Sequence, residues 1–195
     1  MTTTDEAAGL TARGLVVFPL PPGGRLPAGR WQAHCLATPD QVRQRWRDGD
    51  NIGVACRASN LVGLDLDQDD DTDGLAVLAA LAARLGEPWP DTLTVATPSG
   101  GRHLYFRAPT GRIVPSTSGG RSGLGPGIDV RAPGRHSGGY LIGPGSIVNG
   151  VPYVIVRDEP IRPLPDWITD RLTRPLRAGR QRAGRDSKLS CPSRT

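Results

Sequence analysis

The chain has 195 residues and a formal net charge of +5, with 37% apolar and 5% aromatic residues. That length allows one domain of ordinary size with an aliphatic core. No apolar run reaches the roughly 20 residues of a membrane-spanning helix. The three cysteines form no C-x-x-C pair, which argues against a disulfide scaffold and against a structural zinc site. We therefore expect a cytoplasmic protein without a membrane partner.

The positive charge is concentrated at the end of the chain. Residues 171–195 carry eight basic residues and one acidic residue, which leaves 16 basic and 18 acidic residues in 1–170. The last part of the chain is rich in Arg, Gly, Ser and Pro and has little to bury. We predict a single domain over 8–172 and a basic, disordered tail over 173–195. Candidate contacts to nucleic-acid phosphates are Arg131, Arg135, Arg177, Arg180 and Arg182.

The pattern of apolar and turn-forming residues predicts an α+β domain with a mainly antiparallel sheet. Strands are expected at 14–20, 52–56, 61–67, 93–96, 103–107, 128–132, 140–142 and 153–156. Two pairs of these are separated by hairpin-length turns, at 57–60 and at 98–101. Helices are expected from 39 to about 47, capped by Thr38 with Gln41 closing a capping box, from 73 to 85, ended by Gly86, and from 165 to 172.

The strand over 61–67 ends in the sequence Leu64-Asp65-Leu66-Asp67. Residues two apart in a strand share a face, so Asp65 and Asp67 project together while the two leucines enter the core. Adjacent carboxylates repel each other, and an oxygen-preferring cation such as Mg²⁺ or Mn²⁺ would relieve that repulsion. The alternative is that these acids simply begin an exposed acidic run that ends at Asp73.

A second candidate is the turn and strand Ser99-Gly100-Gly101-Arg102-His103. The two glycines allow a close approach of the backbone to a ligand. Main-chain N–H groups there can hold a phosphate, with the Ser, Arg and His side chains as further donors. An ordinary glycine hairpin with a structural histidine explains the same residues.

The third candidate is Asp129, which lies between Ile128 and Val130 in an expected strand. Its carboxylate therefore faces away from its apolar neighbours. It either pairs with Arg131, which shares its face, or completes a metal site with the other acids. The spacing of the three motifs does not show whether they meet in space.

These motifs together resemble the bifunctional DNA primase/polymerase (Prim-Pol) domain of the archaeo-eukaryotic primase superfamily. The resemblance runs from about Gly14 to Tyr153 and includes the opening Gly-Leu-x-Val-Phe-Pro-Leu strand and Asn51-Ile-Gly-Val-Ala. Its three motifs are Asp65-x-Asp67, Ser99-Gly-Gly-Arg-His103 and Ile128-Asp129-Val-Arg. The order and spacing of the motifs carry the resemblance, because each motif is short.

The resemblance implies an RRM-like catalytic core beside a smaller N-terminal α/β unit. It assigns Asp65, Asp67 and Asp129 to two Mg²⁺ or Mn²⁺ ions and His103 to the phosphates of the incoming nucleotide. The implied activity is DNA primase/polymerase, a template-directed nucleotidyltransferase with a two-metal mechanism that makes or extends primers. The implied partners are single-stranded DNA template, nucleoside triphosphates and a separately encoded helicase, and the expected state is a monomer.

Two other functions fit the same residues. One is a non-catalytic nucleic-acid or nucleotide-binding module that recruits a separate replication helicase. The other is a metal-dependent nuclease that uses the same three acids. Because aromatic residues are few, template binding is expected to rest on backbone charge and to depend strongly on salt.

Overall fold

The computed structural model describes residues 2–69, 71–136 and 138–173. Arg177, Arg180 and Arg182, and all but the first residue of the predicted tail, lie outside the described residues. In the described part the chain combines α-helices with mainly antiparallel sheet, as the sequence predicted. None of the helices in these ranges has the length and apolarity needed to cross a membrane.

The strands form two main sheets and one small hairpin. A three-stranded antiparallel sheet has the order β1-β2-β7. A six-stranded sheet has the order β10-β4-β5-β3-β6, with β11 parallel to β5. The strands are β1 Val17–Leu20, β2 Asn51–Ala55, β3 Leu61–Leu66, β4 Thr94–Ala96, β5 Arg102–Arg107, β6 Ile128–Arg131, β7 Tyr140–Ile142, β8 Ile147–Val148, β9 Val151–Pro152, β10 Val154–Arg157 and β11 Arg162–Pro163.

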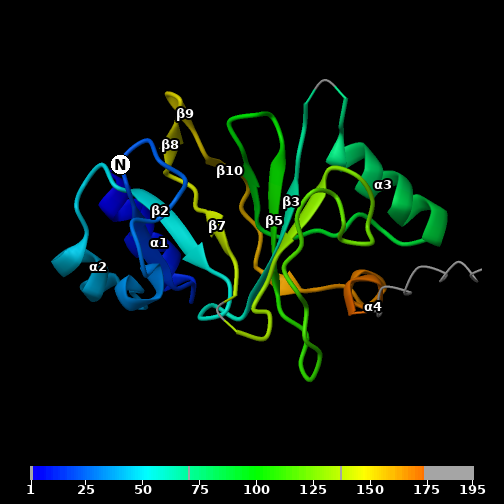
Figure 1. Ribbon diagram of the computed structural model, residues 1–195, viewed down its shortest axis with the longest axis horizontal. Helices are drawn as coiled ribbons and strands as arrows, with labels where there is room; N and C mark the ends of the chain where they lie inside the picture. Colours follow the sequence, from blue (N-terminus) through cyan, green and yellow to red (C-terminus); the bar gives the residue numbers. More distant parts are fainter. Residues whose placement is uncertain (1, 70, 137, 174–195) are drawn as a thin grey trace, which may run out of the picture.

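The smaller sheet belongs to a unit with helices α1 (Thr3–Ala12) and α2 (Pro39–Arg45) and the 3₁₀ helix η1 (Trp31–His34). This unit lies on the left of Figure 1. Most of it comes from the N-terminal part of the chain, but β7 is contributed by a much later segment. Helix α1 was not predicted, and it spans residue 8, where the predicted domain begins.

Helix α2 begins as the sequence predicted. The Thr38 side chain accepts a hydrogen bond from the backbone N–H of Gln41 at 3.3 Å, and Pro39 occupies the first turn. The side chain of Gln41 does not close the expected box, because its Oε1 accepts from the N–H of Ala37 instead. The helix ends at Arg45, about two residues earlier than expected.

The six-stranded sheet separates two hydrophobic clusters. One face packs beneath helices α3 (Gly74–Leu85) and α4 (Asp166–Thr173), to the right of the sheet in Figure 1. From β3 this face takes Val62, Leu64 and Leu66, which are fully buried. From the helices it takes Leu78, Ile168 and others of the same cluster, and the predicted inward residue Trp167 packs there half-buried. The opposite face turns toward the smaller unit.

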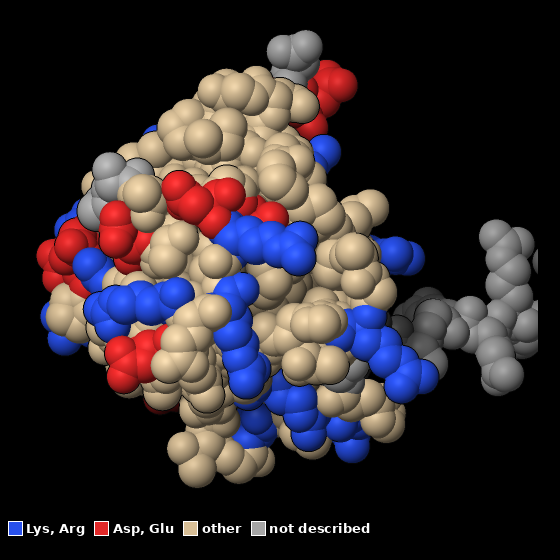
Figure 2. All heavy atoms as spheres, turned by 90° about the vertical axis from the view of Figure 1, so that its left-hand side faces the viewer, with Lys and Arg blue, Asp and Glu red and all other residues tan. Residues whose placement is uncertain are grey.

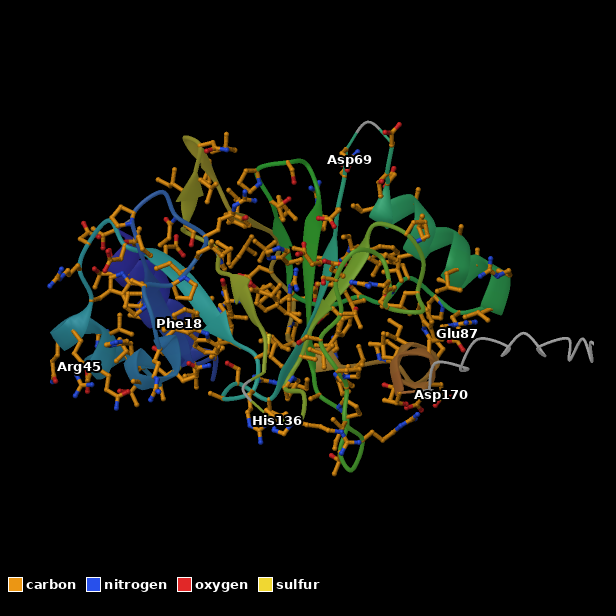
Figure 3. The ribbon with its side chains drawn as sticks, in the orientation of Figure 1. Phe18, Arg45, Asp69, Glu87, His136 and Asp170 are labelled. Carbon is orange, nitrogen blue, oxygen red and sulfur yellow. The ribbon has the colours of Figure 1, made fainter. Side chains whose placement is uncertain are left out.

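The smaller unit has its own apolar centre. Phe18 is fully buried and stacks on Trp31, with ring centroids 4.4 Å apart. Its ring also occupies the space beside Gly53, where an added Cβ would lie 2.2 Å from Cζ of the ring. Figure 3 shows Phe18 among the side chains inside this unit. This cluster extends across to Leu61 and Tyr105 of the large sheet, so the two sheets are joined by apolar packing.

The structure corrects one predicted connection. The expected hairpin of 52–56 with 61–67 is wrong, because β2 pairs with β1 and β7 while β3 pairs with β5 and β6. The turn at 57–60 therefore carries the chain from one sheet to the other. By contrast, the predicted hairpin around 98–101 is confirmed by the antiparallel pair β4 and β5. Helix α3 is capped by Asp73 and ends at Gly86 in the left-handed conformation, also as predicted.

Candidate functional site

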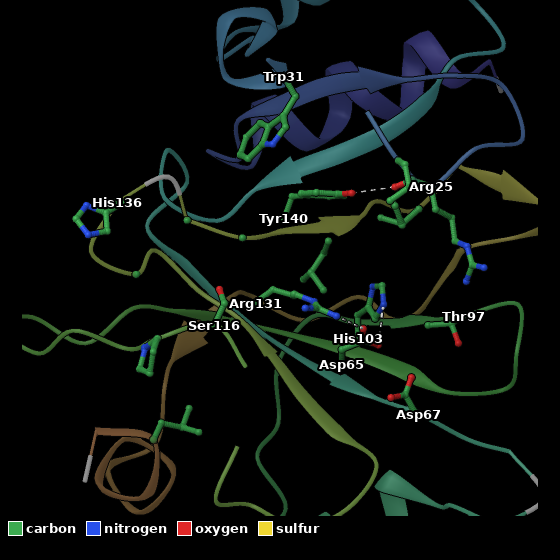
Figure 4. A pocket seen from close by; sticks show the side chains of 18 of the residues that line it. Arg25, Trp31, Asp65, Asp67, Thr97, His103, Ser116, Arg131, His136 and Tyr140 are labelled. Carbon is green, nitrogen blue, oxygen red and sulfur yellow. Dashed lines mark hydrogen bonds and ion pairs between the residues drawn. The ribbon is translucent and has the colours of Figure 1, made fainter. Parts of the chain in front are cut away.

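A cavity of about 1020 Å³ lies between the large sheet and the smaller unit. Its floor is formed by side chains of β3, β5 and β6, and the smaller unit supplies Trp31 and Tyr140 on the other side (Figure 4). Loop residues between β6 and β7, including Arg135 and His136, line it as well. All three motifs that the sequence singled out contribute residues to this region or its immediate border.

The strand register brings two acids and the histidine into one row. Asp65 in β3 is the Cα partner of His103 in β5 on one side and of Asp129 in β6 on the other. Cross-strand partners of this kind have Cβ atoms roughly 5 Å apart and interact directly. The alternation of β3 sends their neighbours Leu64 and Leu66 into the opposite core, as predicted. Three separate stretches of sequence thus meet at one point of the sheet.

His103 is engaged with Asp65. Its Nε2 lies 3.1 Å from Oδ1 of Asp65, and its side chain is 5% exposed. Its Nδ1 is buried and has no hydrogen-bond partner among the described residues. Burial alone would raise the pKa of Asp65, but the hydrogen bond from His103 and the charges of His103 and Arg131 outweigh it and lower that pKa. Asp65 is therefore held as a carboxylate.

Asp129 pairs with Arg131, one of the two possibilities that the sequence left open. The Arg131 Nη2 donates to Oδ2 of Asp129 at 3.3 Å and lies 4.0 Å from Oδ2 of Asp65. The other oxygen of Asp129 accepts a hydrogen bond from the backbone N–H of Gly120 at 3.1 Å. One guanidinium nitrogen therefore sits between two carboxylates that face each other across β3 and β6.

Asp67 follows directly after β3 and is exposed. No ion pair joins it to a basic side chain among residues 2–69, 71–136 and 138–173. Burial of its carboxyl and the nearby charges of Asp65 and Asp129 raise its pKa. The carboxyl of Asp67 is therefore subject to repulsion by the other two acids, and no basic side chain among the described residues forms an ion pair with it.

The three acids are hard oxygen donors of the kind that Mg²⁺ and Mn²⁺ take. Two of them are cross-strand partners, and the third is two residues further along the same strand direction. As their side chains stand, no group of three or more His, Cys, Asp or Glu residues in the part of the chain that the structure describes has an arrangement that could hold a metal ion. The assignment of Asp65, Asp67 and Asp129 to metal ions stays a prediction.

The turn between β4 and β5 closes one end of the cavity. Ser99 lines the cavity together with Thr97, and their hydroxyl oxygens are 3.1 Å apart. Gly101 lies so close to β3 that an added Cβ would be 2.3 Å from the carbonyl oxygen of Leu66. Gly100, Gly101 and Arg102 are not part of the lining, and the Arg102 guanidinium donates to the carbonyls of both glycines at 2.7 and 2.8 Å. The nucleotide-binding role of Ser99, Gly100, Gly101, Arg102 and His103 stays a prediction.

Sequence reasoning missed the aromatic wall of the cavity. Tyr140 meets Phe18 and Trp31 edge-on, at centroid distances of 5.4 and 5.6 Å, and its hydroxyl donates to the carbonyl of Arg25 at 3.0 Å. Tyr153 lines the cavity beside His103, with centroids 5.6 Å apart. Composition alone suggested too few aromatics for stacking. A low count does not show where the few aromatic residues gather, and the pairing of β2 with β7 brings Tyr140 to Trp31.

The predicted phosphate contacts divide into two groups. Arg131 and Arg135 line the cavity, whereas the three arginines of the tail lie outside the described residues. Further basic side chains lie on the smaller unit, including Arg43 and Arg45 in the last turn of α2. Figure 2 views the molecule from the side of this unit and shows several arginine side chains across the middle and lower part of that face, with most acidic side chains further up and to the left.

The structure is thus a mixed α+β domain with a polar, acid-lined cavity between its two sheets. A sequence model of the family described as bifunctional DNA primase/polymerase, N-terminal (Prim-Pol), matches residues 7–167. The chain belongs to this family, as its motifs suggested. Membership implies an enzyme of the nucleotidyltransferase type that is associated with DNA replication. No curated protein sequence matches the chain.

Proposed function

We propose that the protein is a metal-dependent DNA primase/polymerase that joins nucleotides to a primer on a single-stranded DNA template. The observation that carries this proposal is the row of Asp129, Asp65 and His103 across three neighbouring strands. Asp65 and His103 line a cavity of about 1020 Å³, and Asp129 lies directly beside Asp65 on the next strand. A cavity of this size is ample for a nucleoside triphosphate. Family membership supports the same reaction class.

In this proposal Asp65, Asp67 and Asp129 hold two Mg²⁺ or Mn²⁺ ions. When bound, such ions activate the primer 3′-hydroxyl and neutralise charge on the leaving pyrophosphate. The remaining residues position the reactants. His103 orients the carboxylate of Asp65 through the 3.1 Å contact, and Ser99 lies on the cavity wall where a phosphate oxygen can accept its hydroxyl proton.

The aromatic side of the cavity suits the other end of the nucleotide. Trp31 and Tyr140 offer flat, apolar surface opposite the acids, as bases and sugars require. We place the base and sugar there and the triphosphate beside His103 and Ser99. The template strand would then follow the basic side chains outside the cavity and bind with strong salt dependence.

We also propose that the large sheet is the RRM-like core. Its elements follow in the chain as β3-α3-β4-β5-β6, with the antiparallel order β4-β5-β3-β6. A β-α-β-β-α-β fold has a second helix before its last strand. Residues 108–127 form no helix here, and α4 from further along the chain packs on that face of the sheet.

Primer extension tests the proposal. The protein, a primed single-stranded template, labelled nucleotides and Mn²⁺ or Mg²⁺ should give extended products. Asp65→Asn and Asp129→Asn should each lower the rate by at least about 100-fold, because an isosteric amide loses the negative charge that holds the metal ions. Asp40→Asn is the matched control, since Asp40 is an exposed residue of α2 paired only with Arg43 among the described residues. Extension by both site variants at the wild-type rate would refute the proposal.

A further inference from the structure

Arg131 occupies a position that the proposed reaction does not yet explain. Its Nη2 lies 3.3 Å from Asp129 and 4.0 Å from Asp65, on the oxygens that face each other across β3 and β6. Like charges directly opposite in a sheet destabilise it. A guanidinium between them offsets that repulsion, so Arg131 is the counterion of the pair.

Few interactions hold the Arg131 guanidinium in this position. Among the described residues, the bond to Asp129 is the one hydrogen bond its guanidinium makes. Its side chain is 32% exposed and lines the cavity. A long side chain with one such bond and open space beside it exchanges rotamers readily. The two carboxylates, by contrast, are 22% and 11% exposed and fixed on paired strands.

A divalent cation and this guanidinium compete for the same oxygens. Mg²⁺ binds carboxylate oxygen at roughly 2.1 Å. An ion at that distance from Oδ2 of Asp129 would stand within a few ångströms of Nη2, where two positive charges repel strongly in a partly buried site. Asp67 has no such ion pair among the described residues, so the competition concerns Asp65 and Asp129.

We propose that Arg131 is a displaceable internal counterion, which holds Asp65 and Asp129 until a divalent cation takes them and the guanidinium swings into the cavity. This inference rests on the proposed metal-dependent function. It adds a counterion role for Arg131 that the reaction itself does not require. It makes cation binding an exchange of one counterion for another. Wild-type affinity for the cation alone is therefore weaker than three carboxylates would otherwise provide.

Cation affinity, measured with Mn²⁺ by electron paramagnetic resonance without nucleotide or DNA, tests the exchange. Arg131→Gln should bind Mn²⁺ about five- to tenfold more tightly than wild type, which is the effect of removing one partly screened competing charge. Arg135→Gln is the matched control, because Arg135 lines the same cavity and makes no ion pair within the described part of the chain. Its affinity should stay within about twofold of wild type.

A second measurement uses the wild-type protein and so does not depend on how the variant folds. Titration with diamagnetic Mg²⁺ should shift the side-chain Nε–H resonance of Arg131 along the binding curve and leave that of Arg135 in place. Equal gains in Mn²⁺ affinity for both arginine variants, or no gain for Arg131→Gln, would overturn the counterion exchange. If neither wild type nor Arg131→Gln binds Mn²⁺ in a way that Asp65→Asn weakens, the metal site fails, and the proposed function fails with it.

Discussion

The two sheets use their faces differently. In the smaller sheet, every residue of β2 is buried, so both faces serve packing. In the large sheet, one face of β3 is buried throughout, while the other changes from Leu61 at the buried end to Asp65 near the cavity. Between Leu61 and Asp65 this face changes from aliphatic to acidic, and this change marks the point beyond which the smaller unit no longer covers the face. The candidate site residues thus lie on the part of the sheet face that does not pack in a hydrophobic core.

The smaller unit nevertheless supplies half of the cavity. Trp31 and Tyr140 face the acids from across the space, and Phe18 supports both aromatic rings from behind. The comparison therefore predicts that packing in the smaller unit affects ligand binding, whereas packing beneath α3 affects stability alone.

The largest expected effect comes from truncating one fully buried side chain in each of the two hydrophobic clusters. Phe18→Ala and Leu78→Ala remove fully buried side chains and should lower the free energy of unfolding by about 3–5 and 2–5 kcal/mol, respectively. Phe18→Ala should also raise the KM for nucleotide, because the aromatic wall loses its support. Leu78→Ala, on α3, should leave KM unchanged. Denaturant unfolding and steady-state extension below both melting temperatures measure the two effects, and equal shifts in KM would break the distinction between the cores.

A smaller effect is expected at the contact between the turn at 98–101 and β3. The new methyl group of Gly101→Ala would collide with the carbonyl of Leu66, so the turn must shift, at a cost of about 1–3 kcal/mol. Gly9→Ala is the control, because nothing lies within 4 Å of the added Cβ in the helical backbone of α1. It should stabilise the protein by about 0.5–1 kcal/mol. Thermal melts that rank the two variants the other way would contradict the close approach.

The smallest effect, over the first pH unit above 9.0, concerns Cys56, which lies directly after β2 where the chain passes from one sheet to the other. Burial raises the pKa of its thiol to about 12, above the value of 9.0 for an accessible thiol. Between these values the unfolded chain loses the proton and the folded chain keeps it, so this group destabilises the fold as pH rises above 9. The stability advantage of wild type over Cys56→Ala should therefore shrink, by at most about 1.4 kcal/mol per pH unit. A pH-independent difference in denaturant unfolding would show that Cys56 ionises equally in both states.

Local sequence patterns correctly predicted the structural features that depend on residues close together in the chain. The caps of α2 and α3, the hairpin of β4 with β5 and the alternation of Leu64, Asp65 and Leu66 all follow from short-range chemistry. The sequence did not predict which strands pair across long separations. It therefore missed that β2 joins β7 rather than β3, and with it the meeting of Tyr140 and Trp31.

The candidate site shows the same division. The acids and His103 were predicted from their strand positions and the family resemblance, but their register was not. Arg131 was a possible partner of Asp129, and its second contact to Asp65 follows from the pairing of β3 with β6. Helix α1 escaped prediction because its Ala, Gly and Thr residues carry little amphipathic pattern.

Paramagnetic broadening by Mn²⁺ in the presence of a nucleoside triphosphate tests the central claim most directly. The effect falls steeply with distance from the ion, so it locates the ion on the fold. The backbone amide signals of Asp65, His103 and Asp129 should disappear first, while those of Val17, Phe18 and Leu20 in β1 persist. Broadening that is equal over both sheets, or centred away from β3, β5 and β6, would contradict the assignment of the nucleotide site to the polar end of the large sheet.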